Sequence, residues 1–242
     1  MIKRILKVAG IVLLVAIIGI IGVGVASHQP LPAATQKGAA ADTLAIRMLQ
    51  SLKHQAWQQT RWVKWEFRTG TQYLWDKHQQ LVQVSWGHVE VLLHTDTQQG
   101  KVFENGIAVT DEPKKKKLLQ KAWAQFANDS FWLCAPHKVF DPGTTRAIVT
   151  LPDGNEGLLV TYSSGGVTPG DSYLWHLDDD YHPTAWQMWV QIIPIGGLQF
   201  SWEDWTDAPR IARTHRSAWL NVPIKNLSFP TAIETPNPFD RL

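Results

Sequence analysis

Hydrophobic and polar residues alternate along most of the chain after residue 60, and this period of two predicts β-strands. In Arg61–Arg68, for example, Val63, Trp65 and Phe67 share one face of the predicted strand. The same pattern recurs at hairpin spacing in ten more segments: Tyr73–Lys77, Leu81–Trp86, Val89–His94, Lys101–Glu104, Thr145–Leu151, Gly157–Ser163, Ser172–Leu177, Ala185–Ile193, Leu198–Trp205 and Ile211–His215. The chain is therefore predicted to be mainly β, an α+β fold with an antiparallel sheet covered on one face.

Two segments have helical spacing instead. Asp42 can cap a helix that continues to Gln58, because apolar residues recur there about every four positions. A second helix is predicted from Lys114 to about Ala127, with Pro113 in its first turn. The stretch that follows, Asn128–Gly143, is predicted to be a buried crossover into the second set of strands.

The N-terminus has the pattern of a membrane segment. Val8–Ser27 contains no charged residue over twenty positions, which is about 30 Å of helix and the thickness of a bilayer core. Lys3, Arg4 and Lys7 precede it, so the rest of the chain is predicted to lie outside the cytoplasm. A cleaved signal peptide is the alternative, although the apolar run is longer than is usual for one.

These patterns divide the chain into four parts. Residues 1–28 form the predicted transmembrane anchor or signal segment, and residues 29–41 form a linker rich in proline, alanine and glycine. Residues 42–221 form the β-domain. Residues 222–242 contain four prolines and are predicted to form an extended tail.

Composition limits the functions that the domain can have. The 23 basic and 21 acidic residues nearly balance, which argues against nucleic acid as a partner. A single cysteine, Cys134, excludes an intrachain disulfide, and its apolar surroundings predict an inert buried thiol. The 13 tryptophans are far more unusual, and most of them are predicted to lie in the core.

Candidate catalytic chemistry is weak. Histidine and aspartate stand two residues apart at His94 and Asp96 and again at His176 and Asp178, spacings that could serve metal binding or acid–base catalysis. Chance alone produces such pairs readily, and the sequence contains no catalytic or phosphate-binding motif. The sequence predicts no cofactor and no metal site.

Several stretches resemble known envelope proteins. YLWD (Tyr73–Asp76), followed by a hydrophobic strand, and the order of helices and strands over Asp42–Leu220 resemble the LolA/LolB-like lipoprotein-carrier fold. NDSFWL, SGGVTPGDSYLW and IPIGG are similar to segments of an uncharacterised group of bacterial envelope proteins. The resemblance implies a strongly curved antiparallel half-barrel, closed by two or three helices around an apolar cavity. Known carriers are soluble or lipid-anchored, so the predicted anchor of this chain argues against shuttling across the periplasm.

The leading functional hypothesis is an inner-membrane protein with one N-terminal span, whose half-barrel outside the cytoplasm binds a lipid, an acyl chain or a partner protein. Its predicted ligand-binding residues are aromatic: Trp65, Trp75, Trp86, Phe131, Trp132, Trp175 and Trp189. One alternative is an envelope hydrolase, metal-dependent or based on histidine and aspartate. It requires convergence of at least three of five residues: His94, His137, Asp171, His176 and Asp178. A second alternative is a structural subunit of an envelope complex, contacting its partner through Lys114–Lys117 or the C-terminal tail.

Overall fold

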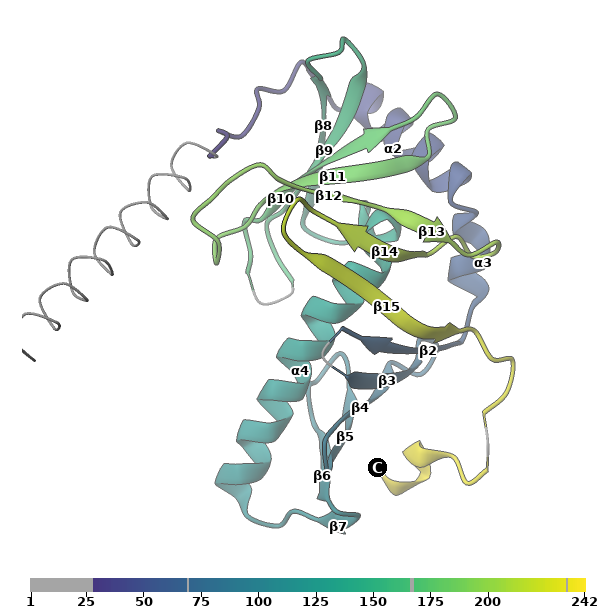
Figure 1. Ribbon diagram of the computed structural model, residues 1–242. Helices are drawn as coiled ribbons and strands as arrows, with labels where there is room; N and C mark the ends of the chain where they lie inside the picture. The colour runs from purple at the N-terminus through teal and green to yellow at the C-terminus, as the bar shows by residue number, and fades with distance from the viewer. Residues whose placement is uncertain (1–27, 69, 166–167, 234) are drawn as a thin grey trace, which may run out of the picture.

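The computed structural model describes residues 28–242 except 69, 166–167 and 234, and it contains two antiparallel sheets (Figure 1). One has six strands in the order β1 (Gln36–Lys37), β8 (Thr144–Thr150), β9 (Glu156–Tyr162), β10 (Ser172–Leu177), β11 (Pro183–Trp189) and β12 (Leu198–Ser201). The other has nine, in the order β13 (Glu203–Trp205), β14 (Ala212–Arg216), β15 (Asn221–Ser228), β2 (Trp62–Phe67), β3 (Thr71–Asp76), β4 (Leu81–Trp86), β5 (Val89–His94), β6 (Gly100–Glu104) and β7 (Ile107–Ala108). The predicted mainly β, antiparallel fold is confirmed, and the described strands do not close into a barrel.

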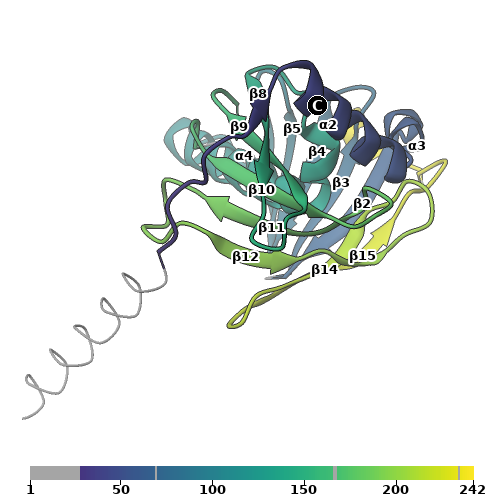
Figure 2. The ribbon, with the colours of Figure 1, turned by 90° about the horizontal axis from the view of Figure 1, so that it is seen from above.

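The two sheets meet at a corner. Trp202 is the only residue between β12 and β13, and its side chain is buried. Its backbone N–H donates to Thr184 O over 2.8 Å, and Arg216 N donates to Ser201 Oγ over 3.1 Å. The chain therefore passes from one sheet into the other without a loop, and both sheets curve around the same core (Figure 2).

Three α-helices cover the inner face of the sheets: α2 (Ala39–Ser51), α3 (His54–Gln59) and α4 (Glu112–Cys134). Helix α2 lies against β8 and β9, and α4 lies against β5 and β6. A short 3₁₀ helix, η1 (Ala135–Lys138), directly follows α4. A second one, η2 (Pro238–Arg241), lies near the C-terminus. Asp111 caps α4 by accepting a hydrogen bond from Lys114 N, and Pro113 lies in the first turn as predicted.

The predicted helices differ from the observed ones at their ends. The first is broken after Ser51, because Lys53 adopts a left-handed conformation with a φ of 53°. The second continues through Asn128–Cys134, which we expected to be a crossover. Polar Asp129 and Ser130 look like a helix stop in the sequence, but both are buried under the sheet, where packing favours the helix.

The C-terminal prediction also needs correction. Residues 222–228, expected in an extended tail, form most of β15, which lies between β14 and β2 inside the nine-stranded sheet. Val222 and Ile224 are buried in the core, and this alternation was obscured by Pro223 between them. The last residues cover the outer face, where the Phe239 ring stacks on Trp62 at 6.1 Å. The linker likewise contributes β1, which pairs with β8.

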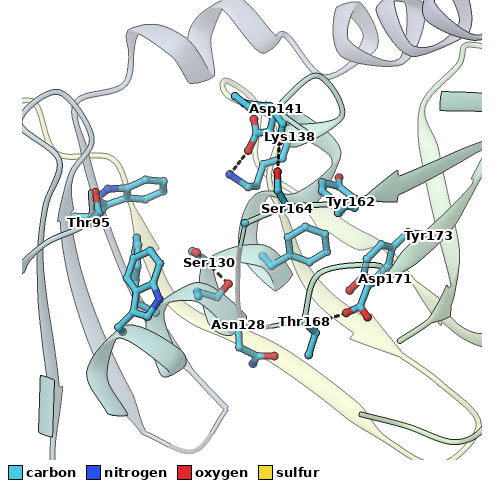
Figure 3. A pocket seen from close by; sticks show the side chains of 17 residues that line it. Thr95, Asn128, Ser130, Lys138, Asp141, Tyr162, Ser164, Thr168, Asp171 and Tyr173 are labelled. Carbon is cyan, nitrogen blue, oxygen red and sulfur yellow. Dashed lines mark hydrogen bonds and ion pairs between the residues drawn. The ribbon is translucent and has the colours of Figure 1, made fainter. Parts of the chain in front are cut away.

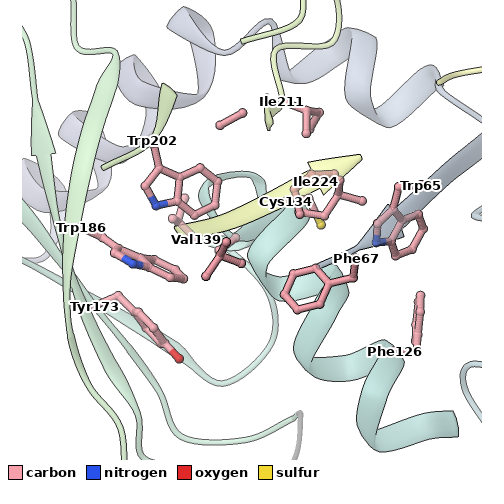
Figure 4. Packing of buried hydrophobic residues seen from close by; sticks show 14 of the residues in the cluster. Trp65, Phe67, Phe126, Cys134, Val139, Tyr173, Trp186, Trp202, Ile211 and Ile224 are labelled. Carbon is pink, nitrogen blue, oxygen red and sulfur yellow. The ribbon is translucent and has the colours of Figure 1, made fainter. Parts of the chain in front are cut away.

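The main core lies between the helices and the inner faces of both sheets and is dense in aromatic rings (Figure 4). Trp65, Trp175 and Trp186 are its largest fully buried side chains. Two smaller apolar clusters lie on the outer faces of the sheets, in agreement with the alternation of side chains along each strand. Six of the 13 tryptophans are buried and most of the others are half-buried against the main core, so ordinary packing accounts for them.

The membrane prediction falls largely outside the described residues. The apolar segment ends at Ser27, and the described chain begins at His28. Across residues 28–242, leaving aside the four omitted positions, no helix combines the length and hydropathy needed for a bilayer span.

Candidate functional site

A cavity of about 470 Å³ lies between α4, the inner face of β3 and the loops that follow η1 and β9 (Figure 3). Its volume lies in the range of ~300–1,000 Å³ that small-molecule sites occupy. The lining residues come from separate segments of the chain: Trp75, Thr95, Trp123, Phe126, Ala127, Asn128, Ser130, Phe131, Lys138, Asp141, Pro142, Tyr162, Ser164, Gly165, Thr168, Asp171 and Tyr173. Three other cavities each have at most one phenylalanine, tyrosine or tryptophan among their lining residues.

Six of the lining side chains are aromatic. On α4, Trp123, Ala127 and Phe131 recur every four residues, so one helix face points into the cavity. Phe131 contacts Tyr173 with ring centroids 4.8 Å apart and meets Tyr162 edge to face at 5.2 Å. Small Ala127, between two bulky neighbours on this face, leaves the space that the cavity occupies.

The polar residues gather on the side formed by the loops. Lys138 Nζ lies 2.5 Å from Asp141 Oδ2, so the two charges neutralise each other. Ser164 Oγ donates to Pro142 O over 3.3 Å, and Thr168 Oγ1 donates to Asp171 Oδ2 over 2.5 Å. The cavity therefore has a long apolar wall and one polar side that is largely satisfied within the protein.

Two tyrosines lie where the apolar and polar parts meet. Burial, and then the neighbouring Asp171 carboxylate, raise the pKa of the Tyr173 phenol, so that it stays protonated. Burial also raises the pKa of Tyr162. The Tyr162 hydroxyl is buried and has no hydrogen-bond partner in the part of the chain that the structure describes. It can donate to a polar atom of a ligand once a shift of the side chain or a neighbour exposes it to the cavity.

The structure separates the seven predicted ligand residues. Trp75 and Phe131 line the cavity, and the other inward-facing residues pack in or against the core: Trp65, Trp86, Trp132 and Trp175. Trp189, which we expected to point inward, lies on the outer face, where its Nε1 donates to Gln29 O over 2.8 Å. Because Trp186 faces inward, the alternation along β11 puts Trp189, three residues later, on the opposite face.

Four aromatic lining residues were missed by the sequence reasoning. Tyr173 stands two residues before Trp175 on the same strand, so strand periodicity already placed it on the inner face. Trp123 and Phe126 belong to the apolar face of α4, and Tyr162 ends β9. The sequence pattern indicates that these side chains point inward, but it does not indicate that a cavity remains between them.

The histidine and aspartate pairs do not build a metal site. Within the described residues, no three His, Cys, Asp or Glu side chains gather closely enough to hold a metal ion. His137 instead packs on Trp57, and its Nε2 donates to Arg210 O over 3.0 Å. The remaining Nδ1 lone pair accepts from His54 Nδ1, 3.0 Å away. The convergence that the hydrolase hypothesis requires is not present.

Cys134 is free and buried, as predicted. Burial raises the pKa of its thiol to about 11, and its Sγ donates to Ser130 O over 3.1 Å. A thiol in this state is a poor nucleophile at neutral pH.

Buried histidines predict acid sensitivity. Burial lowers the pKa of both His137 and His215 to about 3, so both are neutral in the folded protein at pH 5. The unfolded chain binds a proton at each below about pH 6.5, so stability is complete above that pH and falls as pH decreases toward 3. Each histidine should cost up to about 1.4 kcal/mol per pH unit in that window.

This prediction can be measured by urea unfolding of the full chain between pH 7 and pH 5. His215→Phe keeps an aromatic ring between Trp132 and Trp202 but removes the titration, so the variant should lose less stability than wild type on acidification. His88→Asn, at an exposed position in the turn between β4 and β5, should leave the pH dependence unchanged. Equal pH dependence in wild type and His215→Phe would contradict the assignment.

Comparison with known proteins adds no family assignment. The chain matches no protein-family model and no curated protein. Function has to be inferred from the cavity itself.

Proposed function

We propose that this protein is anchored in the inner membrane and binds a hydrophobic ligand, a lipid or an acyl chain, outside the cytoplasm. The observation that supports this most is the cavity of about 470 Å³ between α4 and the inner face of the sheet, with six aromatic side chains around it. In this proposal the two sheets act as one half-barrel, and α4 forms the wall against which the ligand lies. We include in this proposal the resemblance of the sequence to the LolA/LolB-like lipoprotein-carrier fold.

The distribution of polarity favours an amphipathic ligand. The aromatic wall formed by Trp75, Trp123 and Phe131 offers a largely apolar surface, on which the indole N–H groups of the two tryptophans are the only polar side-chain atoms. The loop side offers the Tyr162 hydroxyl and the Lys138–Asp141 pair. An acyl chain along the wall would contact the aromatic rings, and its polar end would lie beside the polar side chains of the loops.

The test uses the full chain in phospholipid vesicles and a fatty acid with a photoactivatable diazirine along its chain. After illumination, adducts should map to the cavity residues of α4, positions 123–131, or to Tyr162. The ligand proposal fails if adducts occur only in residues 8–27, where any membrane segment would be labelled. Mass spectrometry of the digested protein distinguishes the two results.

The structural-subunit alternative makes a separate prediction. It expects a stable partner to co-purify with the membrane form through Lys114–Lys117. Lys114 already pairs with Glu104, so part of this run is occupied within the chain. The C-terminal tail, its other predicted contact, packs Phe239 on the outer face of the sheet.

A further inference from the structure

Two loops expose large apolar side chains near the start of the described chain. Ile192, in the loop between β11 and β12, is 71% exposed, and Trp219, in the loop between β14 and β15, is 88% exposed with Leu220 beside it. Both loops lie on the same side of the molecule as His28 (Figures 1 and 2). Few other large apolar side chains of the described residues are this accessible.

The first of these loops holds the segment that follows the predicted membrane anchor. Gln29 N donates to Gly196 O over 3.0 Å, and Gly196 N donates to His28 Nδ1 over 3.0 Å. The Gln29 side chain accepts from Gln187 Nε2 over 3.0 Å. A side chain at Gly196 would collide with Trp189 and Gln29, so glycine permits this close contact. The chain is therefore fixed to the domain at the first residues after Ser27.

The length of the attachment limits where the membrane lies. One residue of extended chain spans about 3.3–3.6 Å, and His28 directly follows the apolar segment. The interfacial layer of a bilayer is roughly 5–8 Å deep on each side. If the segment spans the bilayer, the loop that carries Gly196 and Ile192 has to lie at or inside this layer.

We propose that the loop 190–197 and the loop 217–220 form a membrane-contact surface that rests in the interfacial layer of the same bilayer. Tryptophan and large aliphatic side chains favour this layer, which explains why Ile192, Trp219 and Leu220 are left without partners in the domain. This surface contacts lipid and not a protein, because the anchor brings these side chains to a lipid surface before any other partner. This inference rests on the proposed membrane anchor and is independent of the cavity ligand.

The membrane-contact surface is connected to the cavity. Gln191, next to Ile192, donates its backbone N–H to Asp171 Oδ1 over 3.0 Å, and its side chain donates to Pro169 O. Asp171 and Thr168 belong to the polar side of the cavity. The loop that we place in the membrane therefore flanks the ligand cavity.

The experiment compares two positions on the surface with one matched control. The variants Ile192→Cys, Trp219→Cys and Ile107→Cys of the full chain, each with one exposed cysteine added to buried Cys134, are labelled with an environment-sensitive fluorophore in vesicles. Ile107 is 74% exposed but lies in β7, at the opposite edge of the nine-stranded sheet from β13 and β14 (Figure 1), and buried Cys134 gives the background in wild type. Lipids with a nitroxide on the acyl chain quench only labels that contact the bilayer.

We expect lipid quenching several-fold stronger at positions 192 and 219 than at 107. Quenching at 192 no stronger than at 107 overturns the proposal. Protection of 192 from a water-soluble quencher without lipid quenching overturns it as well, because it indicates a protein partner. Intact mass confirms that residues 1–27 are present, and the photolabelling of the cavity is scored separately, so failure of one proposal is not failure of the other.

Discussion

Ala127→Phe should abolish labelling of the cavity by the photoactivatable fatty acid while leaving the protein folded. Ala127 lies on the cavity face of α4 between Trp123 and Phe131, and a phenyl ring at this position projects into the space that we assign to the ligand. The ring meets cavity and not packed core, so the cost of overpacking should stay small. The number of α4 adducts per protein, measured by mass spectrometry, should fall to the background level.

A matched control lies one turn away on the same helix. Ala124 is exposed, and Ala124→Phe makes the same chemical change with the same loss of helix propensity. This variant should be labelled as strongly as wild type. Undiminished labelling of folded Ala127→Phe would show that the ligand, if any, lies elsewhere.

Trp186→Ala should be the most destabilising single change in the core. The Trp186 side chain is fully buried, and its ring contacts Tyr173 at 4.6 Å, Trp132 at 5.0 Å and Trp202 at 5.1 Å. Removing a large buried aromatic ring costs about 3–5 kcal/mol of unfolding free energy, since the surrounding rings cannot collapse into the space. For a domain of this size the melting temperature should fall by roughly 6–20 °C.

Trp219→Ala provides the comparison for this measurement. Trp219 is almost fully exposed, so its removal in detergent solution should change the unfolding free energy by no more than about 0.5 kcal/mol. Both variants can be followed by near-ultraviolet circular dichroism of the full chain during heating. A loss below about 1 kcal/mol for Trp186→Ala would mean that the aromatic cluster is not the structural centre of the fold.

The strands were largely predictable because their signal is local. Leu81–Trp86, Val89–His94 and Ser172–Leu177 have the predicted bounds, since alternating side chains and nearby turn residues specify both period and ends. The inward direction of Trp65, Trp75 and Trp175 followed from the same alternation.

Other features depended on contacts between distant segments. The extension of α4 through Phe131 and Trp132 is decided by packing against strands that follow later in the chain. The inclusion of residues 222–228 in the sheet depends on pairing with β2, some 160 residues earlier, which no local pattern shows. The face that Trp189 occupies depends on how β11 pairs with β10, since this pairing turns Trp186 inward and Trp189 outward.

By itself the sequence determined the class of fold, the two kinds of repeating element, the inward direction of several tryptophans and the apolar N-terminal segment, all of which are encoded in residues close together in the chain. Only the tertiary structure decided which aromatic rings fill the core and which line the cavity. A cavity exists where side chains from separate segments of the chain fail to meet, and the size of that gap depends on how helix and sheets pack. The structure likewise decided that His28 and Gln29 are fixed beside Ile192, because the hydrogen bonds responsible join residues more than 150 positions apart.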